Sequence, residues 1–518
     1  MNRPVLVVGA GPVGLATATE LLRRGVPVRL IDKADQPSPL TKALGVWPRT
    51  VEILDRLGAD GAAGRRGLRV RSFRYYSSAR QVARIRFPDR TAPLILPQPE
   101  VEDILADCLT RAGGAVERGT ELLDLVQHDD HVTVRLRESR GGEQVEEFSR
   151  VVGCDGASST VRSLAGIGFE GATYPHTFVV ADTRLDGPLT HDDNHYFCSP
   201  RGVLVIAGLP TGQFRVFTSA PPELTRAGTD LDVVQRLVDE RGPGGLRLHD
   251  ASWISAFNVH ARHADRPMVG RVLLAGDAAH IHSPAGGQGL NTGVYDAYNL
   301  AWKLALVEQG RAREDLLHSY AEERGQAAKD VVRQAHAQTK AWMLTKPHQV
   351  ALRDLALRVA SATRVAHLSY VPTLAGLRAR YFSIHSGQER GGFTPGALVG
   401  DHLVWDVRTS RRTPLRAALS DLRHTLLLCD VTDHSSVVEQ FEADTGLDVR
   451  VLDTAAGSLG LPGAGLPLHR RPKGSPFAVL VRPDQHVAVC APVTDLGPVR
   501  AELRRVLRPV LPTHPAER

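Results

Sequence analysis

The chain of 518 residues is 42% hydrophobic and 23% charged, an ordinary composition for a soluble globular protein that excludes a fibrous or largely disordered chain. Such a length predicts a multidomain protein, with roughly three lobes of about 150 residues each. The formal net charge is +6, but the basic residues are scattered among acidic ones, so we expect no nucleic-acid partner.

The cysteine pattern argues against disulfides and against a zinc site. The five cysteines are an odd number, form no CxxC pair and have no histidine at zinc-ligand spacing. We therefore expect reduced, buried thiols and no metal. The N-terminal apolar run superficially resembles a signal peptide, but the glycine motif at residues 9–14 explains this run better. No later stretch reaches the roughly 18 to 20 apolar residues that span a bilayer. The sequence predicts a cytoplasmic protein without a membrane partner.

The N-terminal region predicts a βαβ unit. Residues 4–8 form a short β-branched run, residues 12–24 have helical periodicity with Pro12 in the first turn, and residues 26–31 are again strand-like. The elements expected next are helices over 50–57 and 100–112 and strands over 116–125, 132–137 and 148–154.

Between about residues 174 and 270 the pattern becomes β-rich, which predicts an inserted sheet domain. The strands expected there are 177–183, 203–209, 214–218 and 246–257. A buried strand over 272–275 and a helix over about 291–308 then return to the first style. The first domain is therefore predicted to be discontinuous.

The last third of the chain begins with helical periodicity and ends in a second α/β pattern. Helices are expected over 315–343, 350–360 and 373–381. Gly391-Gly392 then predicts a linker. The elements expected beyond it are strands over 425–429, 449–452, 478–482 and 487–490 and a helix near 435–445, with a hairpin turned at Pro483-Asp484.

A glycine-rich turn follows the first predicted strand. Gly9-Ala10-Gly11-Pro12-Val13-Gly14 fits the dinucleotide fingerprint, in which the first glycine makes the turn, the second lets backbone approach a pyrophosphate and the third packs helix on strand. The phosphates would lie at the helix N-terminus. Asp32 closes the second strand, with Lys33 beside it, where an acid hydrogen-bonds a ribose hydroxyl. The sequence predicts a dinucleotide site.

Two further motifs narrow the choice of dinucleotide. A strand ends in Asp155-Gly156 and enters a helix that carries Arg162 one turn in. Another strand ends in Gly276-Asp277 and leads through Pro284 and several glycines to a helix. Each string alone is equally typical of a turn with a capping aspartate. The three motifs together, in this order and at this spacing, are far more specific.

With these motifs the chain resembles the class A flavoprotein monooxygenases, the para-hydroxybenzoate hydroxylase family, over nearly its whole length. The resemblance implies an α/β fold: a Rossmann-like FAD-binding domain, an inserted β-sheet substrate domain, a helical segment and a C-terminal thioredoxin-like domain. The ranges expected are 1–173 for the first part of the FAD-binding domain, including substrate-side strands near 68–96, 174–270 for the substrate domain, 271–390 for the second part with the helical region, and 391–518 for the last domain.

The resemblance also implies a cofactor-binding set. Asp277 would hold the ribityl chain of FAD, the Asp155-Gly156 segment with Arg162 would serve FAD and NAD(P)H, and Gln98 would contact the flavin side. The full set expected is Gly9, Gly11, Val13, Gly14, Asp32, Lys33, Lys42, Gln98, Leu122, Asp155, Gly156, Arg162, Gly276, Asp277, Pro284, Gly286, Gly287, Gln288, Gly289, Leu290 and Asn291. Two positions depart from the family pattern: Asp32 replaces the usual Glu, and Lys42 replaces an arginine and loses its bidentate geometry.

The physical character of the segment before the long helix supports the same interpretation. Gly286, Gly287 and Gly289 have no side chains, so backbone could lie against a flat flavin ring. The helix beginning near Asn291 would point its positive end at a reduced, anionic flavin. Only one full nucleotide fingerprint is present, which favours transient binding of NADPH or NADH.

The resemblance implies that dioxygen reacts at reduced FAD to give a C4a-hydroperoxide, which hydroxylates a phenolic or polyketide-like aromatic. Catalytic candidates are Pro284, His280, Arg71 and Tyr196, with His282 and His260 in similar segments, although for any one polar side chain a packing or solvated role is more frequent. Pro284 is expected to line the pocket. A homo-oligomer is possible.

Three alternatives remain open at this point. The same fold could carry out a Baeyer–Villiger oxygen insertion or inactivate an aromatic antibiotic. The chain could be a flavin oxidase or dehydrogenase. It could also be a binding or scaffold protein with a vestigial flavin. The C-terminal domain has no CxxC motif, so we expect a structural or oligomerisation role rather than disulfide exchange.

Overall fold

The computed structural model describes residues 3–77, 80–139, 141–221, 229–363, 365–381, 388–401, 403–406, 410–429, 431, 448–453 and 476–508. Two compact units are present. The first contains Met1–Leu22, Pro27–Ala297 and Arg324–Gly376, and the second contains Arg23–Val26, Tyr298–Glu323 and Leu377–Arg518. The four ranges expected from the sequence stay a prediction.

The first unit is built on a six-stranded sheet with the order β18-β19-β12-β1-β2-β8. Its strands are β1 (Val5–Val8), β2 (Val28–Asp32), β8 (Val116–Arg118), β12 (Arg150–Gly153), β18 (Met268–Val269) and β19 (Val272–Leu274). Central β1 pairs parallel with β2 and β12 and is wholly buried, as its unbroken apolar run requires. Because β19 pairs parallel with β12, strands from before and after residues 174–270 lie side by side in this sheet.

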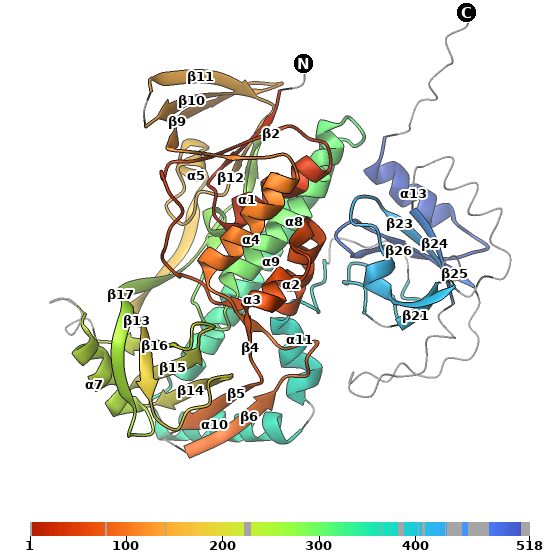
Figure 1. Cartoon of the computed structure of the whole chain (residues 1–518). Helices are drawn as coiled ribbons and strands as arrows, with labels where there is room; N and C mark the ends of the chain where they lie inside the picture. The colour runs from red at the N-terminus through yellow and green to blue at the C-terminus, as the bar shows by residue number, and fades with distance from the viewer. Residues whose placement is uncertain are drawn as a thin grey trace, which may run out of the picture. The chain divides into compact units, whose positions relative to one another are not determined.

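Helices and a smaller sheet cover the six-stranded sheet (Figure 1). The helices of this unit are α1 (Pro12–Arg23), α2 (Pro48–Leu54), α3 (Ala62–Arg66), α4 (Gln98–Arg111), α5 (Thr160–Leu164), α8 (Gly289–Glu308), α9 (Asp315–Trp342), α10 (Pro347–Ala362) and α11 (Val371–Leu374), of which α1, α8 and α9 continue into the second unit. Antiparallel β9 (Thr120–Gln127), β10 (Val132–Glu138) and β11 (Glu143–Phe148) form one small sheet, and β3 (Gly45–Val46), β7 (Leu94–Ile95) and β4 (Leu68–Arg69) form another.

The helix predicted over 373–381 is wrong. The structure ends α11 at Leu374, and Gly376 adopts a left-handed φ of +72°. A Cβ atom at Gly376 would lie 2.4 Å from the Tyr295 hydroxyl oxygen, so the chain turns where it packs closely on α8. Helical periodicity alone did not reveal this turn.

An eight-stranded sheet forms the other half of the first unit, with the order β20-β17-β13-β16-β15-β14-β5-β6 (Figure 1). Its strands are β5 (Ser72–Ser77), β6 (Arg80–Arg86), β13 (Phe169–Asp186), β14 (Asp193–Ser199), β15 (Gly202–Gly208), β16 (Phe214–Ala220), β17 (Arg247–Ala264) and β20 (His280–Ile281). Helix α7 (Leu231–Arg241) packs on β13, β14, β15 and β17. The sequence did not predict β14, which joins β5 to the sheet by parallel pairing.

The second unit contains a mixed six-stranded sheet with the order β22-β21-β24-β23-β25-β26. Its elements are β21 (Leu403–Asp406), β22 (Arg411–Pro414), β23 (Thr425–Cys429), β24 (Asp448–Asp453), β25 (Phe477–Val481), β26 (Val487–Pro492) and α13 (Gly497–Val506). The predicted hairpin is confirmed, since β25 and β26 pair antiparallel. The helix expected near 435–445 lies outside the described residues, and thioredoxin-like topology stays a prediction.

The prediction of buried thiols is confirmed, because all five cysteines are free and buried. Across the described ranges, no helix is both long and apolar enough to cross a membrane, and no cluster of metal-ligating side chains is found.

Candidate functional site

A cavity of about 850 Å³ lies inside the first unit. The turns after β1, β12 and β19 and the turn before α8 line one part of it, together with the loop that follows β2. Strands of the eight-stranded sheet line another part. Nucleotide-binding turns and an apolar sheet therefore share one cavity.

The β1–α1 turn uses its three glycines in two ways. Gly9 has a φ of +100°, and a Cβ atom there would lie 2.5 Å from the Cys154 carbonyl oxygen. A Cβ atom on Gly14 would lie 1.8 Å from the Gly9 carbonyl oxygen. Gly11, in contrast, lines the cavity and would place its Cβ atom within 4 Å of nothing. Protein packing requires Gly9 and Gly14, whereas Gly11 leaves room for a ligand phosphate.

Asp32 ends β2 at the edge of the cavity. Its carboxylate accepts the backbone N–H groups of Ala10 at 2.7 Å and Ala34 at 2.8 Å. These bonds fix the carboxylate beside the glycine turn and use one lone pair on each oxygen. The remaining lone pairs can accept ribose hydroxyls.

Hydrogen bonds from Asn291 and Trp47 fix the turn before α8. Asn291 donates through Nδ2 to the carbonyls of Gly287 at 2.6 Å and Gly45 at 2.8 Å, and its Oδ1 accepts the Trp47 N–H at 2.9 Å. The Trp47 indole N–H donates to the Gly286 carbonyl at 2.9 Å. A Cβ atom on Gly289 would meet nothing within 4 Å. This arrangement presents bare backbone and the N-terminus of α8 to the cavity, as a flat anionic ring requires.

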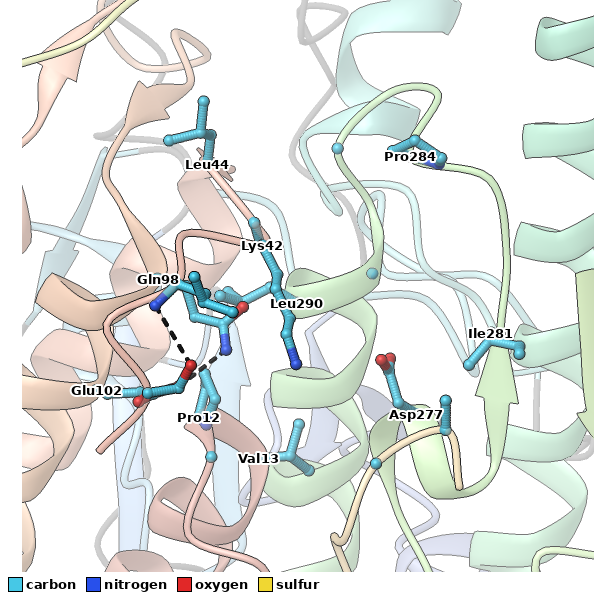
Figure 2. Close-up of a pocket in the computed structure, with 18 of the residues that line it drawn as sticks. Pro12, Val13, Lys42, Leu44, Gln98, Glu102, Asp277, Ile281, Pro284 and Leu290 are labelled. Atoms are coloured by element: carbon cyan, nitrogen blue, oxygen red, sulfur yellow. Dashed lines mark hydrogen bonds between the residues drawn. The ribbon is translucent and has the colours of Figure 1, made fainter. Parts of the chain in front are cut away.

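Asp277 and Lys42 extend into the cavity from opposite sides (Figure 2). Asp277 is exposed to the cavity, yet burial within the unit raises the pKa of its carboxyl group, an effect that the nearby His280 and Lys42 oppose. Gln98 lies on the Lys42 side, where its amide donates to Glu102 at 2.8 Å (Figure 2). The pair of opposite charges fits a ligand with both hydroxyl donors and an anionic portion.

The turn that carries Asp277 is anchored by Asp296. The Asp296 carboxylate accepts the Gly276 N–H at 2.9 Å, His280 Nε2 at 2.7 Å and Arg324 Nε at 2.6 Å. Burial opposes its ionisation, but Arg324 and His280 lower the pKa of Asp296 to about 2. His280 is only 2% exposed and does not line the cavity. The structure therefore gives His280 an anchoring position instead of the predicted catalytic one.

Most of the predicted cofactor set lines the cavity: Gly9, Gly11, Val13, Asp32, Lys33, Lys42, Gln98, Leu122, Asp155, Gly156, Asp277, Pro284, Gly286, Gly287, Gln288, Gly289 and Leu290. Gly14, Arg162, Gly276 and Asn291 lie behind this surface. Arg162 donates to the carbonyls of Ala278 at 3.0 Å and Ala157 at 2.9 Å, so it joins two of the turns that line the cavity.

Only some of the predicted catalytic residues line the cavity. Tyr196 lines the cavity and stacks on Tyr75 with ring centroids 4.9 Å apart, and burial raises the pKa of its phenol well above the ordinary value. Arg71 does not reach the cavity, because its side chain is 76% exposed and pairs with Asp192 at 2.7 Å. Arg71 is therefore a correction to the predicted site. Pro284 lines the cavity as expected.

Sequence reasoning missed the aromatic lining. Aromatic side chains from separate elements surround the sheet part of the cavity: Trp47, Phe73, Phe217, Trp253, Phe257 and Trp342. Phe73 lies on β5, Phe217 on β16, and Trp253 and Phe257 on β17, three strands that meet in one sheet only in the folded protein. Trp47 lies just before α2 and Trp342 at the end of α9. His282 also lines the cavity, and burial lowers its pKa to about 4, which keeps the imidazole neutral at pH 7.

Known proteins are similar to this chain in sequence and in fold. The FAD binding domain family matches residues 2–335. The chain is 36% identical over 451 residues to 6-methylpretetramide 4-monooxygenase of Streptomyces rimosus, covering 82% of this chain and 79% of that protein. It is 34% identical over 360 residues to rifampicin monooxygenase of Streptomyces venezuelae, covering 68% and 74%.

A solved structure agrees over almost the whole chain. Aklavinone-11 hydroxylase, in a ternary complex with FAD and aklavinone, superposes with a TM-score of 0.76 at 29% identity and covers 98% of this chain and 99% of its own. The glycine turn, Asp32 and the bare backbone before α8 fit FAD on their own geometry. This chain therefore belongs to the class A flavoprotein monooxygenases and is an FAD-dependent monooxygenase.

Proposed function

We propose that this enzyme uses NAD(P)H and dioxygen to hydroxylate a phenolic, polyketide-like aromatic. The observation that carries the proposal is one continuous cavity, in which nucleotide-binding backbone faces an aromatic-lined sheet. Bound FAD supplies the reduction of dioxygen and the transfer of one oxygen atom to the ring. The protein binds, orients and shields the two ligands.

The proposed cofactor contacts follow from the side chains that line the cavity. Gly11 and the N-terminus of α1 receive the pyrophosphate, and Asp32 accepts the ribose hydroxyls. Asp277 accepts ribityl hydroxyls, held in place by Asp296 through the Gly276 N–H. Lys42 places a positive charge on the flavin side. NAD(P)H is proposed to bind transiently, since the sequence carries one full nucleotide fingerprint.

The substrate is proposed to lie against the eight-stranded sheet. Trp253, Phe217 and Tyr196 offer ring faces and edges to a flat aromatic molecule. The Tyr196 phenol is protonated at neutral pH, and burial raises its pKa further, so Tyr196 is proposed to donate a hydrogen bond to a substrate oxygen instead of removing a proton. The apolar lining excludes water from the reaction.

The proposal is tested by consumption of reduced nicotinamide. Purified protein should be yellow, and NADPH or NADH oxidation should accelerate when a neutral polycyclic phenol such as 1,8-dihydroxyanthraquinone is added. Protein that stays colourless after addition of FAD would contradict the cofactor assignment. Oxidation that no member of a phenol panel accelerates would contradict the aromatic substrate.

Inactivation of an aromatic antibiotic is the second candidate. It is favoured by the 34% identity to a rifampicin monooxygenase. The two candidates differ in substrate, so incubation with rifampicin and with the phenol panel separates them by which compound gains mass.

A further inference from the structure

The sheet residues that line the cavity carry almost no charge. They are Phe73, Val180, Asn194, Tyr196, Val205, Ala207, Arg215, Phe217, Trp253, Ser255, Phe257, Asn258, Val259, His260 and Ile281. Within this described set, Arg215 is the one arginine or lysine, and aspartate and glutamate are absent. A lone guanidinium beside an aromatic pocket would ordinarily select a carboxylated substrate. The surroundings of Arg215 therefore decide which substrates enter.

Arg215 is neutralised from behind by Asp182. Its Nε and Nη2 donate to the two carboxylate oxygens of Asp182, each at 2.6 Å, which is a bidentate pair. Both residues are only 7% exposed. Asp182 lies on neighbouring β13, directly opposite Arg215 on β16, and does not line the cavity. The cavity thus receives the guanidinium with its charge already balanced.

The geometry leaves Arg215 as a hydrogen-bond donor. Nη1 donates to the Thr41 carbonyl at 2.7 Å, so three of its five N–H groups have acceptors. Two N–H groups remain, one on each terminal nitrogen. The guanidinium carbon lies 5.1 Å from the centre of the Trp253 ring, beside the surface on which a flat substrate would stack. Because the Asp182–Arg215 pair has no net charge, these two N–H donors suit a ketone, quinone or phenol oxygen.

A carboxylate would gain little at this position. An anion that enters an apolar cavity loses hydration and needs an uncompensated cation or several donors in return. The Asp182 charge repels such an anion and cancels the attraction of Arg215. A neutral oxygen loses less hydration and needs only the two donors.

We propose that the Asp182–Arg215 pair makes the site select uncharged, oxygen-bearing aromatic substrates and reject carboxylated ones. Asp182 is then a specificity-determining residue that never touches the substrate. This inference rests on the proposed function, because it places the substrate against the same sheet.

The experiment compares two probes that differ in one carboxylate. The FAD-loaded enzyme is titrated, without NAD(P)H, with 1,8-dihydroxyanthraquinone and with its 3-carboxylic acid at pH 7.5, and tryptophan fluorescence reports binding. Wild-type enzyme should bind the neutral probe at least about tenfold more tightly. Asp182→Asn leaves the Arg215 charge uncompensated, so the carboxylated probe should gain about tenfold while the neutral probe changes little.

Asp186→Asn is the matched control. Asp186 lies on the same strand, its side chain is 80% exposed and it pairs with His249 outside the cavity. Its replacement should leave both affinities unchanged. Equal binding of the two probes to wild type, absence of binding by either, or an Asp182→Asn enzyme with unchanged discrimination would overturn the proposal.

A double variant guards against misfolding of Asp182→Asn, which buries an unpaired cation. Asp182→Asn with Arg215→Gln removes both charges together. It should still reject the carboxylated probe and should bind the neutral probe several-fold more weakly, because glutamine lacks the guanidinium fork. Undiminished binding of the neutral probe by the double variant would show that Arg215 does not contact it.

The binding measurement is separate from the reaction. If the neutral probe binds selectively but no hydroxylated product forms with NAD(P)H and dioxygen, the proposed reaction fails and the selectivity stands. If product forms from both probes equally well, the reaction stands and the selectivity fails.

Discussion

The cofactor part and the sheet part of the cavity differ in the groups that line them. The cofactor part consists mainly of backbone in short turns, with glycines at Gly9, Gly11 and Gly289 and an acid at the end of β2. The sheet part is lined by side chains from strands far apart in sequence, several of them aromatic. A cofactor common to many enzymes can thus be bound by local motifs, whereas the proposed substrate would be bound by residues that only the sheet brings together.

The largest expected effect comes from filling the space beside the glycine turn. Gly11→Leu should abolish measurable FAD binding, because its side chain would occupy the place proposed for the pyrophosphate. Stability of the apoprotein should hardly change, since the Cβ atom meets nothing within 4 Å. FAD titration by flavin fluorescence and thermal unfolding of the apoprotein measure the two quantities.

Gly142→Leu is the control for that variant, because Gly142 is exposed and also has nothing within 4 Å of its Cβ position. It should bind FAD normally. Tight FAD binding by Gly11→Leu would remove this turn from the cofactor site.

Asp277→Ala should weaken FAD binding by about 10- to 100-fold, which corresponds to the loss of hydrogen bonds to a charged group worth about 1.5–3 kcal/mol. The apoprotein should unfold at the same temperature or higher, because burial already disfavours the Asp277 carboxylate. Asp103→Ala, an exposed position on α4 outside the cavity, should bind FAD like wild type. Unchanged affinity in Asp277→Ala would contradict the ribityl assignment.

Asp296→Asn should lower the stability of the protein, which Asp277→Ala should not. Replacement of the buried carboxylate removes the ion pair with Arg324 and frees the Gly276 turn, so the free energy of unfolding should fall by about 3 kcal/mol. FAD affinity should fall with it, by about tenfold. A variant with normal stability and weak FAD binding would mean that Asp296 contacts the cofactor instead of holding the turn.

Phe217→Leu tests the sheet part of the cavity. It should leave FAD affinity unchanged and weaken binding of 1,8-dihydroxyanthraquinone by about three- to tenfold, since an aromatic contact is worth about 0.5–1.5 kcal/mol beyond the area that it buries. Fluorescence titrations with each ligand measure both. If the variant lost affinity for FAD but not for the anthraquinone, Phe217 would belong to the cofactor part of the cavity.

The smallest expected effect is the pH dependence of stability at His282. Its folded pKa of about 4 lies below the ordinary value of 6.5, so the unfolded chain takes up the proton first as the pH falls. Stability from the neutral imidazole is present above pH 6.5 and is lost as the pH falls through 6.5 toward 4. From pH 7.5 to 5.5, wild type should lose about 1 kcal/mol more than His282→Asn, measured by urea unfolding. Equal losses would contradict the lowered pKa.

The sequence predicted the cofactor part of the cavity better than the sheet part. The turns at Gly9, Asp155 and Asp277 were predicted because glycine and acid spacing along one segment determines them. The positions of Asn291 and Arg162 behind the cavity were not, since their partners, Gly45 and Ala278, come from distant segments. The end of α11 was missed because only contact with Tyr295 shows why Gly376 must turn.

The sheet part was hardest to predict for the same physical reason. Parallel pairing of β5 with β14 sets Ser72 beside Asp193, and Arg71 pairs with neighbouring Asp192 outside the cavity. Alternation along a single strand reveals which residues share a face, but not which face becomes the cavity. Tyr196 was predicted among several candidates, whereas Asp182 and Arg215 gave no sequence signal.

The fate of labelled dioxygen tests the proposed reaction most directly. The FAD-loaded enzyme is supplied with NADPH or NADH, ¹⁸O₂ and a panel of neutral phenols that includes 1,8-dihydroxyanthraquinone. We predict a product that carries one ¹⁸O atom, formed together with nicotinamide oxidation. Hydrogen peroxide in the same amount as the oxidised nicotinamide, with no labelled aromatic product from any member of the panel, would contradict the account.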